Sequence, residues 1–295
     1  MKNKGELAVF LSAVLWGCIG ISVRNLERLG VGSLGIVFLR CFSTVIILTV
    51  LLLIRFHADL KIHRRDLPLL AGNGILSVLM FTYCYYTTIA LSTLSVAAVL
   101  MYTAPIFVMI ISVLFFKEKL TVNKVIAVII SFVGCAFVSG IVGTAIKISP
   151  TALCFGLLTG FGYSLYTIFS SRLIIRGNST LTVIYYTFLF ALAGSVVLLL
   201  LRRETAIFTY PAEAWLWAFL MGIFNTILPY LLYTYGLKSM EPTKAPIIAT
   251  VEPAFATVLG FFAYGEKLTI FGVIGIVLVL GSVVIVNLKS KKKAT

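Results

Sequence analysis

Charged residues are scarce in this chain of 295 residues. Asp, Glu, Lys and Arg together make up 12% of it, whereas 60% is hydrophobic and the mean hydropathy is +1.09. A soluble domain carries about 25% charged residues, so too few are present here to cover a surface in water. Disorder is excluded as well, because a disordered chain has low hydrophobicity. The composition therefore indicates a polytopic membrane protein.

Groups that carry enzyme chemistry are also scarce. The two histidines, His57 and His63, share one loop and lack the cysteine or carboxylate cluster of a metal site. No phosphate-binding loop occurs, and the sequence GVGSLG at 30–35 lacks the preceding strand that a dinucleotide fingerprint needs. The five cysteines are isolated in apolar runs, where they act as small hydrophobic residues. We expect no enzyme, no metal and no cofactor.

Ten apolar runs alternate with short polar breaks along the chain. Each approaches the roughly 20 residues that a helix needs to cross a bilayer core. Strands of a membrane barrel would alternate in hydropathy over about 10 residues, and these runs do not. The predicted fold is all-α, with ten transmembrane helices, spans one to ten, at 7–23, 34–54, 67–89, 94–116, 122–141, 151–174, 181–201, 214–235, 245–264 and 270–288.

The basic residues predict the orientation of these spans. If the N-terminus is cytoplasmic, most of the 24 Lys and Arg residues fall on the inner side. Cytoplasmic loops carry such an excess, so both termini are expected in the cytoplasm of a cell-membrane protein. The net charge of +14 is then a basic face beside anionic lipid, and no nucleic-acid partner is expected.

The two halves of the chain share a pattern. Pro105 is followed thirteen residues later by Glu-Lys-Leu-Thr at 118–121, and Pro253 by the same tetrad at 266–269. Because each copy has five spans, the first tetrad is expected inside and the second outside. We expect repeats at 1–145 and 146–288, inverted in the membrane, and a basic cytoplasmic tail at 289–295. Inverted repeats are a recurring plan of secondary transporters, with the substrate site near the midplane.

These features resemble a known family. Ten helices in two copies, a proline in spans four and nine, and the endings Lys117-Glu118 and Gly265-Glu266 are similar to the drug/metabolite transporter superfamily, in particular its EamA-like members. The resemblance covers nearly the whole chain. It implies a cavity lined by spans one, three, four, six, eight and nine, with five and ten peripheral. It also implies a carrier of amino acids, related metabolites or other small solutes.

Two ionisable residues lie within spans, where a charge is costly and marks a pathway. Glu252 is too far from either end of span nine to reach water, so it must face a cavity, pair or be protonated. We predict that it recognises a substrate amine or exchanges a proton; the alternative is a neutral carboxyl bonded to a neighbouring helix. Arg40 marks a charge site, or it anchors span two by reaching the outer headgroups. Their depths argue against a direct pair.

Prolines and polar aromatic residues complete the candidate site. Pro105 and Pro253 are predicted hinges, because proline removes a backbone hydrogen bond; plain kinks are the alternative. Rings and hydroxyls suit a small amphipathic ligand, although interhelical packing would explain each residue taken singly. The candidate substrate-binding residues besides Glu252 are Trp16, Tyr83, Tyr86, Tyr102, Tyr163, Tyr166, Asn225, Tyr230 and Tyr233.

The sequence therefore predicts a secondary transporter that moves a small organic solute by alternating access. Efflux of an amino acid or related metabolite, driven by protons or by the solute's own gradient, is the leading interpretation. A carrier or exchanger of an amine, nucleoside or drug is the alternative, and a channel or intramembrane enzyme is disfavoured. The expected partners are the solute, the lipid bilayer and protons, and a homodimer is compatible with the sequence.

Overall fold

The ten predicted spans are helical in the computed structural model, which describes residues 2–142, 148–204, 209–265 and 267–288. Nine helical stretches there are long and apolar enough to cross a membrane, and a tenth, α8, is slightly shorter. The all-α, polytopic prediction is confirmed. Glu266 of the second tetrad and the predicted tail at 289–295 lie outside the described residues.

Four of the spans are single helices in the described part, and α8 makes a fifth. Span two is α3 (Ser33–Arg55), span six is α9 (Pro150–Ile175), span seven is α10 (Thr180–Arg202) and span ten is α15 (Ile270–Asn287). Span five is α8 (Val122–Val138). Short 3₁₀ turns, His57–Leu60 and Arg64–Asp66, lie in the loop between spans two and three.

The other five spans are interrupted. Span one divides into α1 (Lys2–Gly17) and α2 (Ile19–Arg28), span four into α6 (Leu94–Met101) and α7 (Ala104–Phe116), and span nine into α13 (Lys244–Ala249) and α14 (Val251–Tyr264). Spans three and eight each contain a π-helical turn. Span three is α4 (Leu67–Gly74), η3 (Ile75–Met80) and α5 (Phe81–Leu91); span eight is α11 (Ala212–Gly222), η5 (Ile223–Ile227) and α12 (Leu228–Leu237).

The interruptions of spans three and four recur at equivalent places in spans eight and nine, whereas the break in span one has no counterpart in span six. The π-turns begin at Ile75 and Ile223, an offset of 148 residues that also separates Pro105 from Pro253. Both prolines lie in the first turn of the helix that follows a break, where the backbone N–H that proline lacks would have no partner within the helix. The pattern of the repeat therefore extends from the sequence to the backbone.

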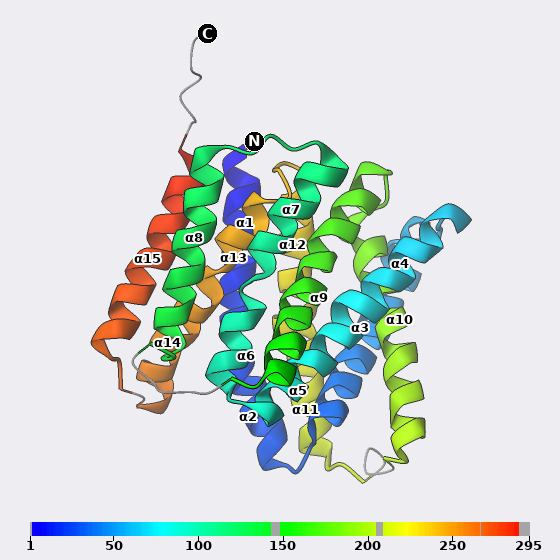
Figure 1. Ribbon diagram of the computed structural model, residues 1–295. Helices are drawn as coiled ribbons and strands as arrows, with labels where there is room; N and C mark the ends of the chain where they lie inside the picture. Colours follow the sequence, from blue (N-terminus) through cyan, green and yellow to red (C-terminus); the bar gives the residue numbers. More distant parts are fainter. Residues whose placement is uncertain (1, 143–147, 205–208, 266, 289–295) are drawn as a thin grey trace.

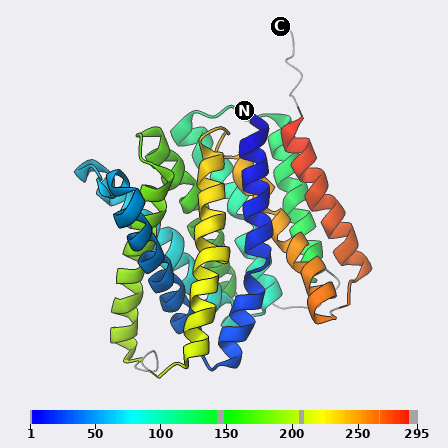
Figure 2. The ribbon, with the colours of Figure 1, turned by 180° about the vertical axis from the view of Figure 1, so that it is seen from behind.

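The packing interleaves the two halves. α1 packs against α12 and α14, while α9 of the second half packs against α5, α6 and α7 of the first. α8 and α15 pair with each other at one edge of the bundle, and α3 and α10 lie toward the other edge (Figure 1). Figure 2 shows α1 and α12 side by side from behind. The expectation that spans five and ten are peripheral agrees with this arrangement.

Candidate functional site

A cavity of about 400 Å³ lies between the two halves at the broken ends of spans one, four and nine. It extends from the middle of the bundle to the face where α2 and α14 end, opposite the face where α1 begins (Figure 1). Spans three and five contribute to its wall as well, whereas no described residue of spans six or eight lines it, which differs from the lining that the family resemblance implied. Its polar and aromatic lining includes Trp16, Arg24, Tyr85, Tyr102, Glu252 and Tyr264.

Glu252 is placed at the inner end of this cavity by the break in span nine. It is the second residue of α14, directly after the break at Thr250. Its Oε2 atom is buried and has no hydrogen-bond partner among the described residues. The Tyr163 hydroxyl lies within hydrogen-bonding reach of the carboxyl. One carboxylate oxygen thus remains available to a ligand.

Tyrosines surround this carboxyl on several sides. Tyr102 lines the cavity from the break in span four, and Tyr85 lines it from α5. Both are close enough to Glu252 to interact with it electrostatically, as is Tyr163. Tyrosine hydroxyls accept hydrogen bonds, and their ring faces attract cations. The arrangement is chemically suited to an ammonium group, which needs a negative charge and acceptors.

The carboxyl has no counterpart in the first half of the chain. At the repeat offset, Glu252 corresponds to Ala104, the first residue of α7. Pro253 corresponds to Pro105, so the backbone break is duplicated while the charge is not. The site is therefore built on a symmetric scaffold from asymmetric side chains.

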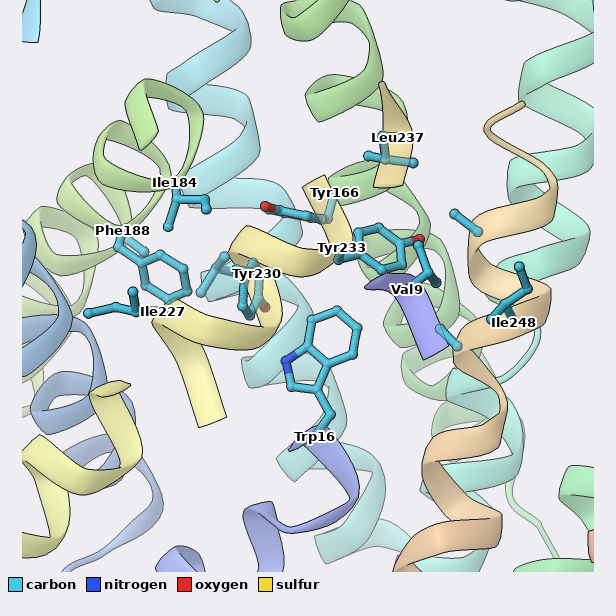
Figure 3. Close-up of a cluster of buried hydrophobic side chains, with 14 of the residues drawn as sticks. Val9, Trp16, Tyr166, Ile184, Phe188, Ile227, Tyr230, Tyr233, Leu237 and Ile248 are labelled. Atoms are coloured by element: carbon cyan, nitrogen blue, oxygen red, sulfur yellow. The ribbon is translucent and has the colours of Figure 1, made fainter. Parts of the chain in front are cut away.

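A second group of the predicted residues packs together beside the cavity rather than in it. The Trp16 ring centre is 5.2 Å from that of Tyr230 and 5.4 Å from that of Tyr233, and Tyr166 lies 4.8 Å from Tyr230. Figure 3 shows Trp16 pointing from α1 toward these tyrosines. Two hydroxyls are paired with threonines of neighbouring helices, Tyr166 with Thr234 at 2.7 Å and Tyr233 with Thr167 at 2.6 Å. Trp16 alone belongs to both the cluster and the cavity wall.

Arg40 points into the bundle. Its Nε donates a hydrogen bond of 2.9 Å to the Thr226 hydroxyl of η5, and its guanidinium lies 5.7 Å from the ring centre of Tyr230 and 5.9 Å from that of Phe188. No direct Arg40–Glu252 ion pair is formed in the described part of the chain, as their depths predicted. The half-buried guanidinium of α3 thus contacts the aromatic cluster.

Tyr83 and Tyr86 lie in a different place. Both line a groove of about 370 Å³ between spans two, three and seven, where the Arg202 guanidinium is 5.8 Å from the Tyr83 ring centre. Tyr83 is 45% exposed. The residue of this stretch that lines the Glu252 cavity is Tyr85, which the three-residue spacing of Tyr83 and Tyr86 did not single out.

Asn225 connects two helices. Its Nδ2 donates a 2.9 Å hydrogen bond to the Leu15 carbonyl, and its Oδ1 accepts one of 2.9 Å from the Ser22 hydroxyl. Both ends of the amide are therefore used in joining span one to span eight. This is the interhelical role that amides have in membrane proteins.

Comparisons with known proteins agree on one family. The sequence pattern of the EamA-like transporter family matches residues 3–140 and again residues 150–288. An "uncharacterized transporter" of Archaeoglobus fulgidus is 29% identical, covering 95% of both chains. The "uncharacterized inner membrane transporter YicL" of Salmonella typhimurium is 27% identical, covering 99% of this chain and 98% of its own. A solved crystal structure at 16% identity has the same fold, with a TM-score of 0.81 over 96% of this chain and 97% of that one.

Proposed function

Because the chain belongs to the EamA-like transporter family, we propose that it is a secondary carrier that exports a small solute bearing an amino group, an amino acid or a related metabolite. Family membership and the apolar helices make it a multi-pass membrane transporter. The substrate class, the direction and the mechanism are the proposal. We place it in the cell membrane with both termini in the cytoplasm, as the basic residues predict.

The observation that carries the proposal is the unpaired carboxylate oxygen of Glu252 at the end of a cavity in the bundle. A carboxyl at this depth is costly, and ionisable residues within spans usually mark substrate or proton pathways. A cavity of about 400 Å³ admits a solute of amino-acid size together with some water. An ammonium group would bind the carboxylate, while the rings of Tyr85 and Tyr102 face the rest of the solute.

The cavity and the buried residues beyond it support alternating access as the proposed mechanism. The cavity reaches the face where α14 ends, whereas Val9, Ile248 and Ala249 are buried between it and the opposite face. The broken spans four and nine supply the hinges at Pro105 and Pro253. We propose that Glu252 takes up a proton when the solute leaves, so that a proton gradient drives export.

Counterflow in proteoliposomes tests this proposal. Vesicles loaded with a mixture of unlabelled amino acids and amines are assayed for uptake of each labelled compound. We expect saturable counterflow of at least one amine-bearing solute. Glu252→Gln should reduce apparent affinity by about 10- to 100-fold, the worth of a hydrogen bond to a charged group. Retention of full counterflow and its pH dependence by this variant would refute the proposal.

Glu27→Gln is the matched control. Glu27 lies on α2 near the same face as the cavity mouth, but its side chain is exposed and does not line the cavity. The same chemical change there should leave affinity unchanged, because it removes a solvated charge. A loss in both variants would indicate a general effect of surface charge instead of recognition by Glu252.

A further inference from the structure

Lys124 is a buried cation on the face where α1 begins. Only 4% of the residue is exposed. Its Nζ donates hydrogen bonds of 2.6 Å to Glu118 Oε1 and 2.9 Å to the Lys119 carbonyl, and it forms an ion pair of 3.0 Å with Glu241 Oε2. All three ammonium donors therefore have acceptors. Lysine is almost never buried unless it is paired in this way.

The contacts of Lys124 join the two repeats. Glu118 lies in the link between α7 and α8, whereas Glu241 lies in the link between α12 and α13. Glu118 Oε2 also accepts a 3.4 Å hydrogen bond from the Thr243 backbone, just before α13 begins. The network thus ties the end of span four to the beginning of span nine. These are the two spans whose breaks border the Glu252 cavity.

The network borders a hollow on the face where α1 begins. This second hollow, of about 670 Å³, is lined by Glu6, Glu118, Lys119, Lys238, Glu241 and Lys244. Between the two hollows, Ala245, Ile247 and Ala249 of α13 are buried in the core. A solute leaving the cavity toward this face would have to part span four from span nine. Another ion pair between the repeats, Arg176–Asp66 at 2.8 Å, joins spans six and three, away from this path.

The network cannot be duplicated at the other face. At the repeat offset, Lys124 corresponds to Gly272 in the first turn of α15, which has no side chain. Two inverted copies with equal side chains would favour the two open states about equally. Charge-assisted hydrogen bonds present in only one state shift that balance, since a population follows the difference in free energy between states.

We infer that Lys124, with Glu118 and Glu241, is an ionic latch that holds the carrier closed at the face where α1 begins and open at the other. This inference rests on the proposed alternating-access function. It also identifies Lys124 as the residue that determines which open state is favoured at rest. Opening toward the latched face requires these contacts to separate. Lys124 is a positioning residue, because it does not contact the solute cavity.

Distance measurements on the full chain in lipid nanodiscs test the latch without any substrate. Spin labels are attached at Lys119→Cys and Lys238→Cys, both exposed and on opposite sides of the network. The five native cysteines are first replaced by alanine in a background verified to fold. The parent should give mainly the short separation. Lys124→Gln should raise the ratio of long to short separations about tenfold, as loss of a charge-assisted contact implies.

Three further variants make the result decisive. Lys124→Arg keeps the charge and the donors and should restore the short separation. Lys117→Gln removes a charge from the same link, but from an exposed side chain, and should change nothing. Glu241→Gln should give a smaller shift, because its side chain is 51% exposed. If Lys124→Gln fails to fold, Glu241→Gln carries the test.

An unchanged distance distribution in folded Lys124→Gln overturns the latch, even if that variant is less heat-stable. This outcome is separable from failure of the proposed function. A parent protein that shows no counterflow of any amine, with distances that still respond to Lys124→Gln, would refute the export proposal and leave the latch standing. Counterflow of an amine by the parent protein, with distances that do not respond to Lys124→Gln, would support the export proposal and refute the latch.

Discussion

Lys117 occupies a backbone conformation that favours glycine. It ends α7 with a φ of +52°, in the left-handed region, and the equivalent residue at the end of α14 is Gly265, with a φ of +66°. A side chain with a Cβ costs roughly 1–2 kcal/mol in this region. Part of that cost is offset because glycine loses more backbone entropy on folding. The first copy therefore carries strain that the second avoids.

Lys117→Gly should stabilise the protein. We expect a gain of about 0.5–1 kcal/mol in the free energy of unfolding, which corresponds to about 1–3 °C in the midpoint of thermal unfolding. Lys119→Gly is the control, because Lys119 in the same link has no positive φ. It should be neutral or slightly destabilising. A thermal unfolding series in detergent measures both, and equal shifts would contradict the strain argument.

At the scale of single residues, the sequence predicted an isolated charged residue within a span more easily than a contact between two distant residues. Glu252 stood out in the sequence because it is the one carboxylate within a span, and the structure gives it a cavity. Lys124 did not stand out, because it lies at the beginning of span five, where lysine is common. Its partner Glu241 comes from the other repeat, and local sequence carries no signal for that pairing.

At the scale of helices, α8 and α15 approach each other through glycine. A Cβ on Gly134 would lie 3.0 Å from the Val279 nitrogen and 3.1 Å from the Gly275 carbonyl oxygen. Small residues allow this contact, which in membranes depends on close packing and not on the hydrophobic effect. Gly281 of α15, one residue before the position that matches Gly134 at the repeat offset of 148, has open space around it. The two glycines therefore serve different purposes.

Gly134→Leu should separate this helix pair. Overpacking of a close contact costs about 1–3 kcal/mol, so we expect a clear fall in the thermal unfolding midpoint. Gly281→Leu makes the same change toward open space and should leave the midpoint nearly unchanged. Equal effects in the two variants would show that helix propensity, and not the α8–α15 contact, governs the result.

Helix positions were predictable, but helix faces were not. Span four was predicted at 94–116 and is found at Leu94–Phe116. An apolar run of this length in a membrane must form a helix, so its ends follow from the sequence. The π-turn Ile75–Met80 leaves no mark in hydropathy. It alters the rotation per residue, so the 3.6-residue spacing upstream no longer predicts which face a later residue presents. Beyond this turn, Tyr85 lines the cavity and Tyr83 does not.

At the scale of the whole molecule, the backbone features are repeated in the two copies, whereas the charged side chains are not. Both copies repeat the broken span and the π-turn. Glu252 and Lys124 correspond to Ala104 and Gly272, so each charge exists once. The scaffold would supply two states of similar energy, and the charges that are not duplicated would supply a binding site and a preferred direction of opening.

This arrangement depends on the two copies crossing the membrane in opposite senses. Five spans separate the equivalent loops, so the Lys119 link and the Lys267 link must emerge on opposite faces. In the proposed orientation, which the excess of basic residues predicts, the Lys119 face is cytoplasmic. In the cysteine-free background, a membrane-impermeant maleimide should therefore label Lys267→Cys on intact cells and Lys119→Cys only after permeabilisation. Both side chains are exposed, so access to the reagent does not depend on local unfolding. Labelling of both positions from one side would mean that the copies are parallel, and a cavity shared by inverted halves could not then open to each face in turn.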